Sequence, residues 1–275
     1  QLSPDTRAGN WDACSGYHYN DTTLKGFSHT HLSGTGCIDL GDILFRPTTL
    51  KPDLTTESIY QPAAFSHKDE DASAGYYSVV LKEEGIKAEL TVTAHAGMHR
   101  YTFSSGKEAS IIIDLTHLLD NEYIYEAELE QTAANEITGM RRTRGWTDNQ
   151  YVYFVAQFSK PFQAIDFIQN KKMVSAGVKL NGTDLQACLS FDNSNGEPVI
   201  AKVGLSIVSE KNARENLETE VIGFDFDAVR SAARSAWEQA LSAITVKGGN
   251  TDDLKNFYTA MYHSMVVPNV VSDVN

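Results

Sequence analysis

Short runs of alternating apolar and polar residues fill much of the chain and predict β-strands. One clear run has its alternate apolar side chains at Ile86, Ala88, Leu90, Val92 and Ala94. The run that begins at Ser110 is continuously apolar, which is typical of a strand buried on both faces. Turn sequences such as Asn181-Gly182 separate further runs up to about Ser209. Many short strands at regular spacing predict an antiparallel β-sandwich or barrel.

After Ser209 the apolar period changes from two to about 3.6 residues, which predicts helices. A short helix is predicted over residues 211–220 and a long one from an N-cap at Asp225 or Asp227. The long helix has an apolar stripe that includes Trp237, so we expect this tryptophan in a core. Gly248-Gly249 ends this unit, and Thr251 caps a further amphipathic helix that Pro268 closes.

These patterns divide the chain into a β-sandwich domain (1–209), a helical linker (210–249) and the start of an all-α region (250–275). The chain opens without a methionine, in an extended segment, and it stops soon after a helix. We therefore expect both ends to be cut from a longer protein. Because no glycine-rich phosphate loop follows a strand, a doubly wound nucleotide-binding fold is disfavoured.

Composition and charge narrow the class of partner. Of the 275 residues, 41% are hydrophobic, which is ordinary for a globular protein. The net charge of −13 repels phosphate backbones and argues against nucleic-acid binding. No apolar run approaches about 18 residues, so we expect no membrane span. The three cysteines, Cys14, Cys37 and Cys188, favour neither a disulfide framework nor a zinc site; Cys14 and Cys37 could be bridged or reduced.

The segment from Gly26 to Asp42, GFSHTHLSGTGCIDLGD, is the most unusual part of the chain. A buried strand would be richer in branched apolar residues, whereas this segment carries hydrogen-bonding side chains and several glycines. That combination favours a loop that grips a polar ligand. His29 and His31 lie on one side if the segment is extended. They either bond a ligand or form a buried pair that organises the loop, and we expect no metal on them.

Other polar residues allow a functional and a structural interpretation. Asp39 and Asp42 could be a catalytic carboxylate pair, but turn-forming aspartates that bond nearby backbone are the better interpretation. Residues 68–71 read as a solvated charged loop. An indole can stack on a sugar, so Trp11 and Trp146 are candidate ligand contacts, with packing as the alternative for both. Asp12, Tyr17 and His18 would orient the loop or line the edge of the site, and His95, His99 and His117 read as structural.

Six motifs, in order, resemble glycoside hydrolase family 92, the calcium-dependent exo-acting α-mannosidases. They are QLSPDTR, WDACSGYHY, GFSHTHLSGTGCIDLGD, KVGLSIVS, FDFDAVRSAARSAWEQAL and FYTAMYHSMVVPNVVSD. The resemblance implies a mainly β chain: a large antiparallel β-sandwich, linker helices, and the first helix of a truncated (α/α)6 barrel. The active site would lie between the sandwich and the barrel.

By this resemblance the full-length protein would remove terminal α-linked mannose from glycans by an inverting mechanism, in the periplasm or outside a bacterial cell. The acid, the base and the calcium ligands would belong to the barrel, so this segment would hold no catalytic or metal residue and would alone be inactive. Its contribution would be substrate-binding loops, with contacts from Trp11, Asp12, His29, His31 and Trp146. The alternative is a non-catalytic carbohydrate-binding β-sandwich module, which the amphipathic helix after Gly249 argues against.

Overall fold

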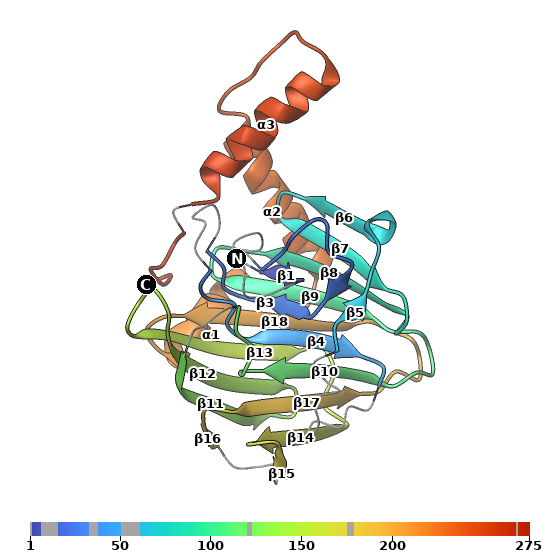
Figure 1. The fold of residues 1–275 in the computed structure, drawn as a ribbon, viewed down its shortest axis with the longest axis vertical. Coiled ribbons are helices and arrows are strands. Elements are labelled where there is room, and N and C mark those ends of the chain that lie inside the picture. The colour runs from blue at the N-terminus through green and yellow to red at the C-terminus, as the bar shows by residue number, and fades with distance from the viewer. Residues whose placement is uncertain are drawn as a thin grey trace.

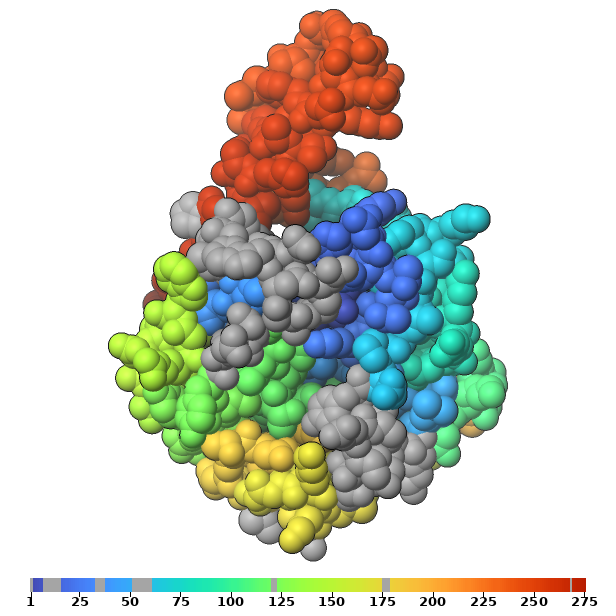
Figure 2. All heavy atoms as spheres, viewed as in Figure 1, coloured from blue at the N-terminus to red at the C-terminus, as the bar shows by residue number. Residues whose placement is uncertain are grey.

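The computed structural model describes residues 2–6, 16–32, 38–50, 61–119, 123–174, 179–267 and 269–275. Within these residues, two large antiparallel sheets pack face to face, and the helices follow the last strand (Figure 1). The predicted mainly β, antiparallel sandwich is therefore confirmed. The α3 region, red in Figure 2, projects from one end of the rounded sandwich, whereas α2 contacts β7, β8 and β9.

The first sheet has seven strands among the described residues, and its order departs from the order along the chain. In space its strands are β1 (Ser3–Asp5), β3 (Gly26–Ser28), β4 (Leu44–Thr48), β10 (Ala109–Asp114), β17 (Leu185–Phe191), β14 (Ala164–Gln169) and β15 (Lys172–Val174). Strand β10 is the predicted run from Ser110, and every residue in it is buried, as expected. Strands β2 (Thr23–Leu24) and β5 (Ala63–Ala64) pair only with each other and form a small separate sheet.

The second sheet has nine strands in the described part of the chain. In space they are β16 (Leu180–Gly182), β11 (Tyr123–Ala133), β12 (Glu136–Arg144), β13 (Gln150–Phe158), β18 (Val199–Ser206), β9 (Ala96–Thr102), β8 (Ile86–Val92), β7 (Tyr76–Leu81) and β6 (Glu70–Ser73). A short 3-10 helix, η3 (His67–Asp69), precedes β6. Strand β18 joins two sequential meanders, β6–β9 and β11–β13, into one sheet.

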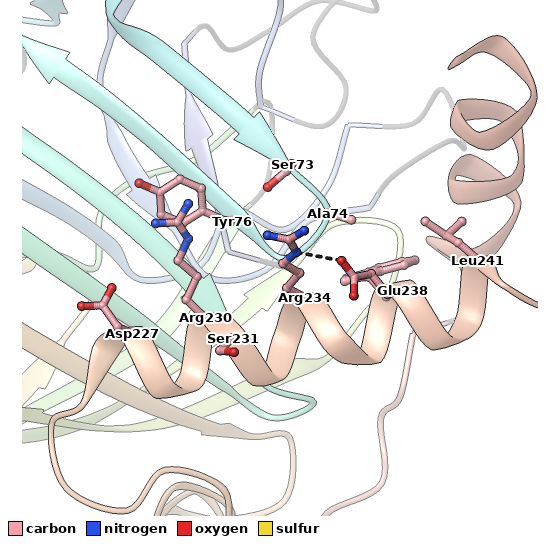
Figure 3. Close-up of a pocket in the computed structure, with 10 residues that line it drawn as sticks. Ser73, Ala74, Tyr76, Asp227, Arg230, Ser231, Arg234, Glu238 and Leu241 are labelled. Atoms are coloured by element: carbon pink, nitrogen blue, oxygen red, sulfur yellow. Dashed lines mark hydrogen bonds and ion pairs between the residues drawn. The ribbon is translucent and has the colours of Figure 1, made fainter. Parts of the chain in front are cut away.

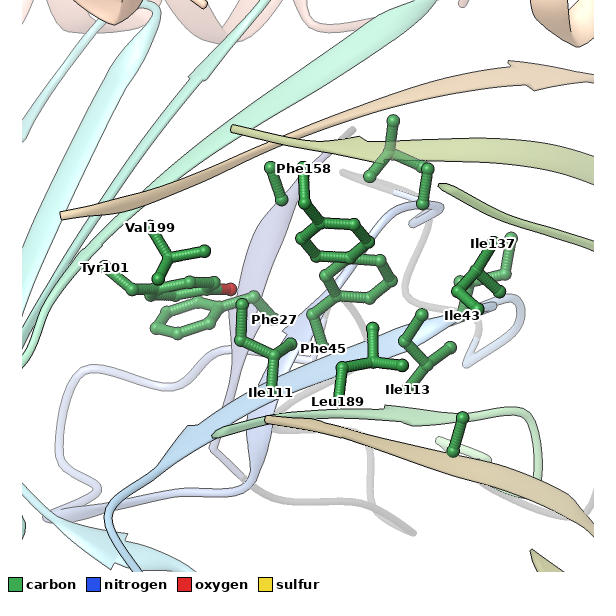
Figure 4. Packing of buried hydrophobic residues seen from close by; sticks show 14 of the residues in the cluster. Phe27, Ile43, Phe45, Tyr101, Ile111, Ile113, Ile137, Phe158, Leu189 and Val199 are labelled. Carbon is green, nitrogen blue, oxygen red and sulfur yellow. The ribbon is translucent and has the colours of Figure 1, made fainter. Parts of the chain in front are cut away.

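The main core fills the space between the sheets (Figure 4). Phe45 of the first sheet stacks on Phe158 of the second, with ring centroids 6.3 Å apart and planes 7° from parallel. The predicted alternation in β8 is confirmed for Ile86, Ala88 and Leu90, which are buried in this core. Ala94 is exposed instead, because β8 ends at Val92 and the chain turns.

Three helices close the described chain: α1 (Glu210–Glu220), α2 (Phe226–Leu241) and α3 (Thr251–Met265). Helix α1 packs on β18 so closely that a Cβ at Gly204 would lie 2.3 Å from the Ala213 carbonyl oxygen. Helix α2 begins at the predicted cap, Asp225, whereas α3 is capped by Asn250 through a capping box rather than by Thr251. None of the described helices is long and apolar enough to span a membrane.

The apolar stripe of α2 is less covered than predicted. Phe226 is its one buried residue, and Trp237 is half-buried against the ring of Tyr262, at 4.7 Å between centroids. The reason is visible in Figure 1, where α2 runs away from the sandwich edge toward α3. The boundaries placed after residues 209 and 249 stay a prediction.

Candidate functional site

The loop singled out in the sequence begins in β3 and leaves the sheet at His29. A Cβ at Gly26 would lie 2.8 Å from the carbonyl oxygen of Phe45, so only glycine fits there without a shift. The two ends of the loop pair through a β-bridge between His31 and Leu40 and through backbone hydrogen bonds from Gly41 to Thr30 and from His29 to Asp42. Residues 33–37, including Cys37, lie outside the described residues, as do Trp11, Asp12 and Cys14.

His29 is buried and bonds to protein atoms at both ring nitrogens. Its Nδ1 lies 2.7 Å from the Ile43 carbonyl oxygen and its Nε2 2.9 Å from Nε2 of His99, whose Nδ1 lies 2.7 Å from the Tyr101 hydroxyl. A carbonyl accepts only, so Nδ1 of His29 donates, His99 Nε2 donates to His29, and the Tyr101 hydroxyl donates to His99. Burial lowers the pKa of His29 to about 4 and holds that of His99 well below its ordinary value, which fits two neutral rings.

His31 and His117 share one buried carboxylate, that of Asp5 in β1. His31 Nε2 lies 2.7 Å from Asp5 Oδ1, and His117 Nε2 lies 2.9 Å from Asp5 Oδ2. Burial by itself raises the pKa of Asp5, but the two imidazoles outweigh it and hold that pKa below its ordinary range. The cluster ties the loop to β1 and to the segment after β10.

Asp42 ends the loop in a buried ion pair. Arg141 of β12, which is 1% exposed, donates through Nε to Asp42 Oδ1 at 2.7 Å and through Nη1 to the carbonyl oxygens of Leu115 and His117. Thr30 donates to Asp42 Oδ2 at 2.6 Å. Asp39 instead accepts backbone N–H groups from Leu40 and Trp146, which fits the turn-forming interpretation for Asp39 and not for Asp42.

Strained backbone lies between these anchors. Leu40 has φ +73° and Ile43 has φ +59°, values that disfavour side chains with a Cβ and most of all a β-branched one. Such conformations cost about 1–3 kcal/mol each and persist where the surroundings over-determine them. Here the surroundings are the Asp42–Arg141 pair and the bond from His29 to the Ile43 carbonyl.

The loop forms part of one wall of a large open groove at the end of the sandwich. The groove has a volume of about 1850 Å³ and lies between the β-strands and α3 with the segment after it. The sandwich side includes His29, Thr30, His31 and the turns β8–β9 and β12–β13, and the opposite side includes residues 262–267 and 269–273. A groove of mixed aromatic and polar lining can bind a polar ligand with apolar faces.

Glu70, which the sequence predicted to lie in a solvated loop, lies in this groove. The Glu70 side chain is 8% exposed, and it accepts from the hydroxyls of Tyr17 at 3.0 Å and Tyr77 at 2.6 Å and from His67. Burial, and after it the charge of Glu70 and the hydrogen bonds to it, raise the pKa values of Tyr17 and Tyr77, so both hydroxyls remain donors. Tyr77 is close to Glu70 in the sequence, so the tyrosines at 76–77 were the available signal that Glu70 has a hydroxyl partner. Tyr17 is 53 residues from Glu70, and no sequence pattern indicated that contact.

The opposite wall is fastened by a second polar network. Asp273 accepts from Ser206 at 3.0 Å, from Asn212 at 2.6 Å and from Asn216 at 2.8 Å. His95, predicted on a strand, lies in the β8–β9 turn; its ring bonds to Glu220 and, through Nε2, to the Ser272 carbonyl oxygen at 2.6 Å. The segment 269–275 therefore docks on β18 and α1.

Trp146 lies on the β12–β13 connection, and its side chain is 73% exposed. It does not line the groove itself, although the next residue, Thr147, does. The structure thus brings His29 and His31 together at the groove and leaves Trp146 outside it. Contact of any of these residues with a substrate stays a prediction.

A smaller cleft of about 550 Å³ lies between α2 and the β6–β7 turn (Figure 3). Its charged side chains are engaged with the protein: the Arg230 guanidinium lies 3.5 Å from the Tyr76 ring centroid, and Arg234 pairs with Glu238. This cleft is a packing feature of α2. Among the residues that the structure describes, no group of three or more His, Cys, Asp and Glu side chains is placed to hold a metal ion.

Sequence comparison places the chain among known proteins. The model of the glycosyl hydrolase family 92 N-terminal domain matches residues 1–206, and that of the family's catalytic domain matches residues 212–275. A secreted glycosidase of Arthroderma benhamiae, described as uncharacterized, is 30% identical over 92% of this chain and 36% of its own length.

Solved structures agree. A family GH92 alpha-mannosidase from Bacteroides thetaiotaomicron, in complex with mannoimidazole, has a TM-score of 0.93 and 37% identity over 100% of this chain and 37% of its own. A further GH92 family glycosyl hydrolase has a TM-score of 0.88 and 26% identity, over 99% of this chain and 38% of its own. The chain therefore spans well under half the length of the relatives it matches.

Proposed function

The chain belongs to glycosyl hydrolase family 92, and on that premise we propose that it is the N-terminal part of an exo-acting α-mannosidase. The full-length protein would hydrolyse terminal α-linked mannose from glycans with inversion at the anomeric carbon. The observation that carries the proposal is the groove, because one wall comes from the sandwich and the other from α3 and the segment after it. A pocket completed by both regions suits an enzyme better than a self-contained binding module.

Inverting hydrolysis needs one carboxyl group to protonate the leaving oxygen and another to activate water across the sugar ring. The described carboxylates at the groove and beneath it are held by protein donors: Glu70 by two tyrosines and a histidine, Asp42 by Arg141, and Asp273 by Ser206, Asn212 and Asn216. We therefore assign the acid and the base to the part of the protein beyond this chain.

Calcium would also be held by that part. Calcium takes six to eight oxygen ligands, commonly several of them carboxylates, and the described residues offer no such cluster. The described residues do not fit the ion, so we propose no catalytic step of this chain through it.

This chain would shape the pocket. The buried bonds of His29 and His31 hold the described ends of this loop, residues 26–32 and 38–42, in place, so exposed atoms at these ends would meet the sugar in a fixed geometry. Trp11, Asp12 and Trp146 remain proposed contacts, the first two outside the described residues. The relative described as a secreted glycosidase supports a secreted enzyme, and we propose an extracellular or periplasmic location in a bacterium.

The test uses the full-length protein with calcium and a panel of α-linked mannosides. We expect release of mannose, with the β-anomer appearing first by NMR, and loss of activity on chelation that added calcium restores. If no α-mannoside yields mannose while a control α-mannosidase does, the proposal fails. Initial release of the α-anomer would contradict inversion alone, and full activity in chelator would contradict the calcium requirement alone.

A further inference from the structure

A cluster of tyrosines covers the outer face of three neighbouring strands of the nine-stranded sheet. Tyr123 and Tyr125 lie in β11 and Tyr151 and Tyr153 in β13, and Arg142 of β12 stands between them. Arg142 pairs directly with Tyr151 in the strand register. The inward positions of β13, such as Val152 and Phe154, belong to the core, so Tyr151 and Tyr153 face outward. We call these five residues the tyrosine platform.

The platform is held in a defined geometry. The Arg142 guanidinium carbon lies 5.0 Å from the ring centroid of Tyr125 and 5.4 Å from that of Tyr151, and Nε and Nη2 both donate to Asn149 Oδ1. The rings of Tyr151 and Tyr153 are 6° from parallel, with centroids 6.2 Å apart. Tyr123 and Tyr125 contact edge to face at 5.1 Å. The arginine thus acts as a spacer that fixes rings on both sides of it.

The β11 side of the platform is open to solvent, the β13 side is continuous with the groove through Tyr151, and Tyr153 is partly buried against the apolar cluster under α1. Tyr123 is 61% exposed and Tyr125 is 39% exposed, although large aromatic side chains usually bury most of their area. Tyr151 and Asn149 also line the groove, so the platform begins at the groove rim and extends outward over β12 and β11. A ligand that enters the groove end-first would pass over it.

The chemistry of the platform favours a carbohydrate as its occupant. Its ring faces offer apolar surface, while the four hydroxyls and Arg142 offer hydrogen bonds, which matches the apolar and hydroxyl-bearing faces of a pyranose. An apolar protein surface would bury these polar groups without partners, at a cost. Nucleic acid is disfavoured because the neighbouring residues Glu126 and Glu128 are acidic and the chain carries a net charge of −13.

We propose that the tyrosine platform is a distal sugar-binding surface that holds the inner residues of a polymeric or branched α-mannan while the terminal mannose enters the groove. The proposal rests on the function proposed for the groove. It makes the preferred substrate a long glycan rather than a free disaccharide, because only a long glycan reaches both surfaces.

The test is carried out on the full-length protein with the double variant Tyr123→Ala/Tyr125→Ala, which leaves the groove lining intact. On yeast α-mannan we expect KM to rise roughly 3- to 30-fold, as the loss of one or two stacking contacts predicts. On a small aryl α-mannoside, which covers only the groove, kcat/KM should stay within about 2-fold. Tyr123→Phe/Tyr125→Phe keeps the rings and should behave nearly as the wild type; Met173→Ala, an exposed residue of β15, is the surface control.

Affinity electrophoresis in gels containing α-mannan measures the same binding without turnover. Retardation of the wild type that the double alanine variant loses supports the platform, even if the protein proves to have no mannosidase activity. An unretarded wild type overturns it. Equal KM on mannan in both proteins also overturns it, as does an equal loss on mannan and on the aryl mannoside, since the face would then be packing against the rest of the protein.

Discussion

His29 and His31 owe their positions to partners far away in the sequence. His29 bonds to His99, 70 residues on, and His31 to Asp5, 26 residues before it. A polar run with glycines predicted a ligand-gripping loop, but local pattern cannot say that both rings are buried, because the partners come from other strands. Organising the loop is the role that these contacts favour, and contact with a sugar stays a prediction.

The pH dependence of stability should reveal the buried His29. Its pKa is about 4 in the fold against about 6.5 in an unfolded chain, so between these values the unfolded state binds a proton that the folded state does not. This residue therefore costs stability as pH falls from about 6.5 to about 4, on the order of 3 kcal/mol in total. His29→Asn keeps a donor for the Ile43 carbonyl and does not titrate.

Calorimetry at pH 7 and pH 4.5 checks this. The fall in Tm between the two should be smaller in His29→Asn than in the wild type, though not abolished, because His99 still titrates. His263→Asn, at an exposed position of α3, serves as the control and should leave the fall unchanged. An unaltered fall in His29→Asn would show that the ring is protonated in the fold.

Among the contacts between elements, the packing of α1 on β18 depends on a glycine at position 204. A Cβ at Gly204 would meet the Ala213 carbonyl oxygen at 2.3 Å and the Leu217 Cβ at 2.6 Å. Gly204→Ala should therefore push α1 off the sheet and cost about 1–3 kcal/mol. Gly97→Ala is the matched change, since its nearest neighbours are side-chain atoms of Leu2 at 3.0 Å and His29 at 3.6 Å, which can yield.

Urea denaturation of both variants gives the comparison. Equal midpoints for Gly204→Ala and the wild type would mean that the helix is free to shift. A shift of the midpoint for Gly204→Ala well beyond that for Gly97→Ala is the expected result.

The elements themselves were largely readable from the sequence, while their partners were not. Period-two patterns marked strands such as β8, and the change of period after Ser209 marked the helices. Spatial order was not readable: nothing local in residues 199–206 says that β18 lies between β13 and β9. For the same reason Glu70 was misread as solvated, because its partner Tyr17 is 53 residues away, and Trp237 was placed in a core that α2 leaves half open.

Across the whole molecule, the Asp42–Arg141 pair links the two sheets, since Asp42 precedes β4 of one and Arg141 lies in β12 of the other. Arg141→Met should cost about 3–5 kcal/mol, because it leaves the Asp42 carboxylate buried and unpaired. Asp42→Asn in the same background should recover part of the loss. Arg234→Met, which removes an exposed pair with Glu238, should cost less than about 1 kcal/mol.

A double-mutant cycle by urea denaturation measures the coupling between Asp42 and Arg141. Additive losses in the two single variants would contradict a direct pair. A coupling near zero with normal stability would also remove the support proposed for the strained backbone at Leu40 and Ile43.

The place of β18 sets the order in which the protein can be completed as it is synthesised. The β6–β9 meander supplies the β8–β9 turn of the groove, and the β11–β13 meander supplies the β12–β13 turn. Each meander pairs locally and can form early, but residues 199–206 must leave the ribosome before the two can be joined. Until then the nascent chain carries two unpaired strand edges, those of β9 and β13, which chaperones or neighbouring chains could capture. A slow stretch of translation placed far enough beyond residue 206 for β18 to have left the ribosome would protect the chain more than one placed earlier.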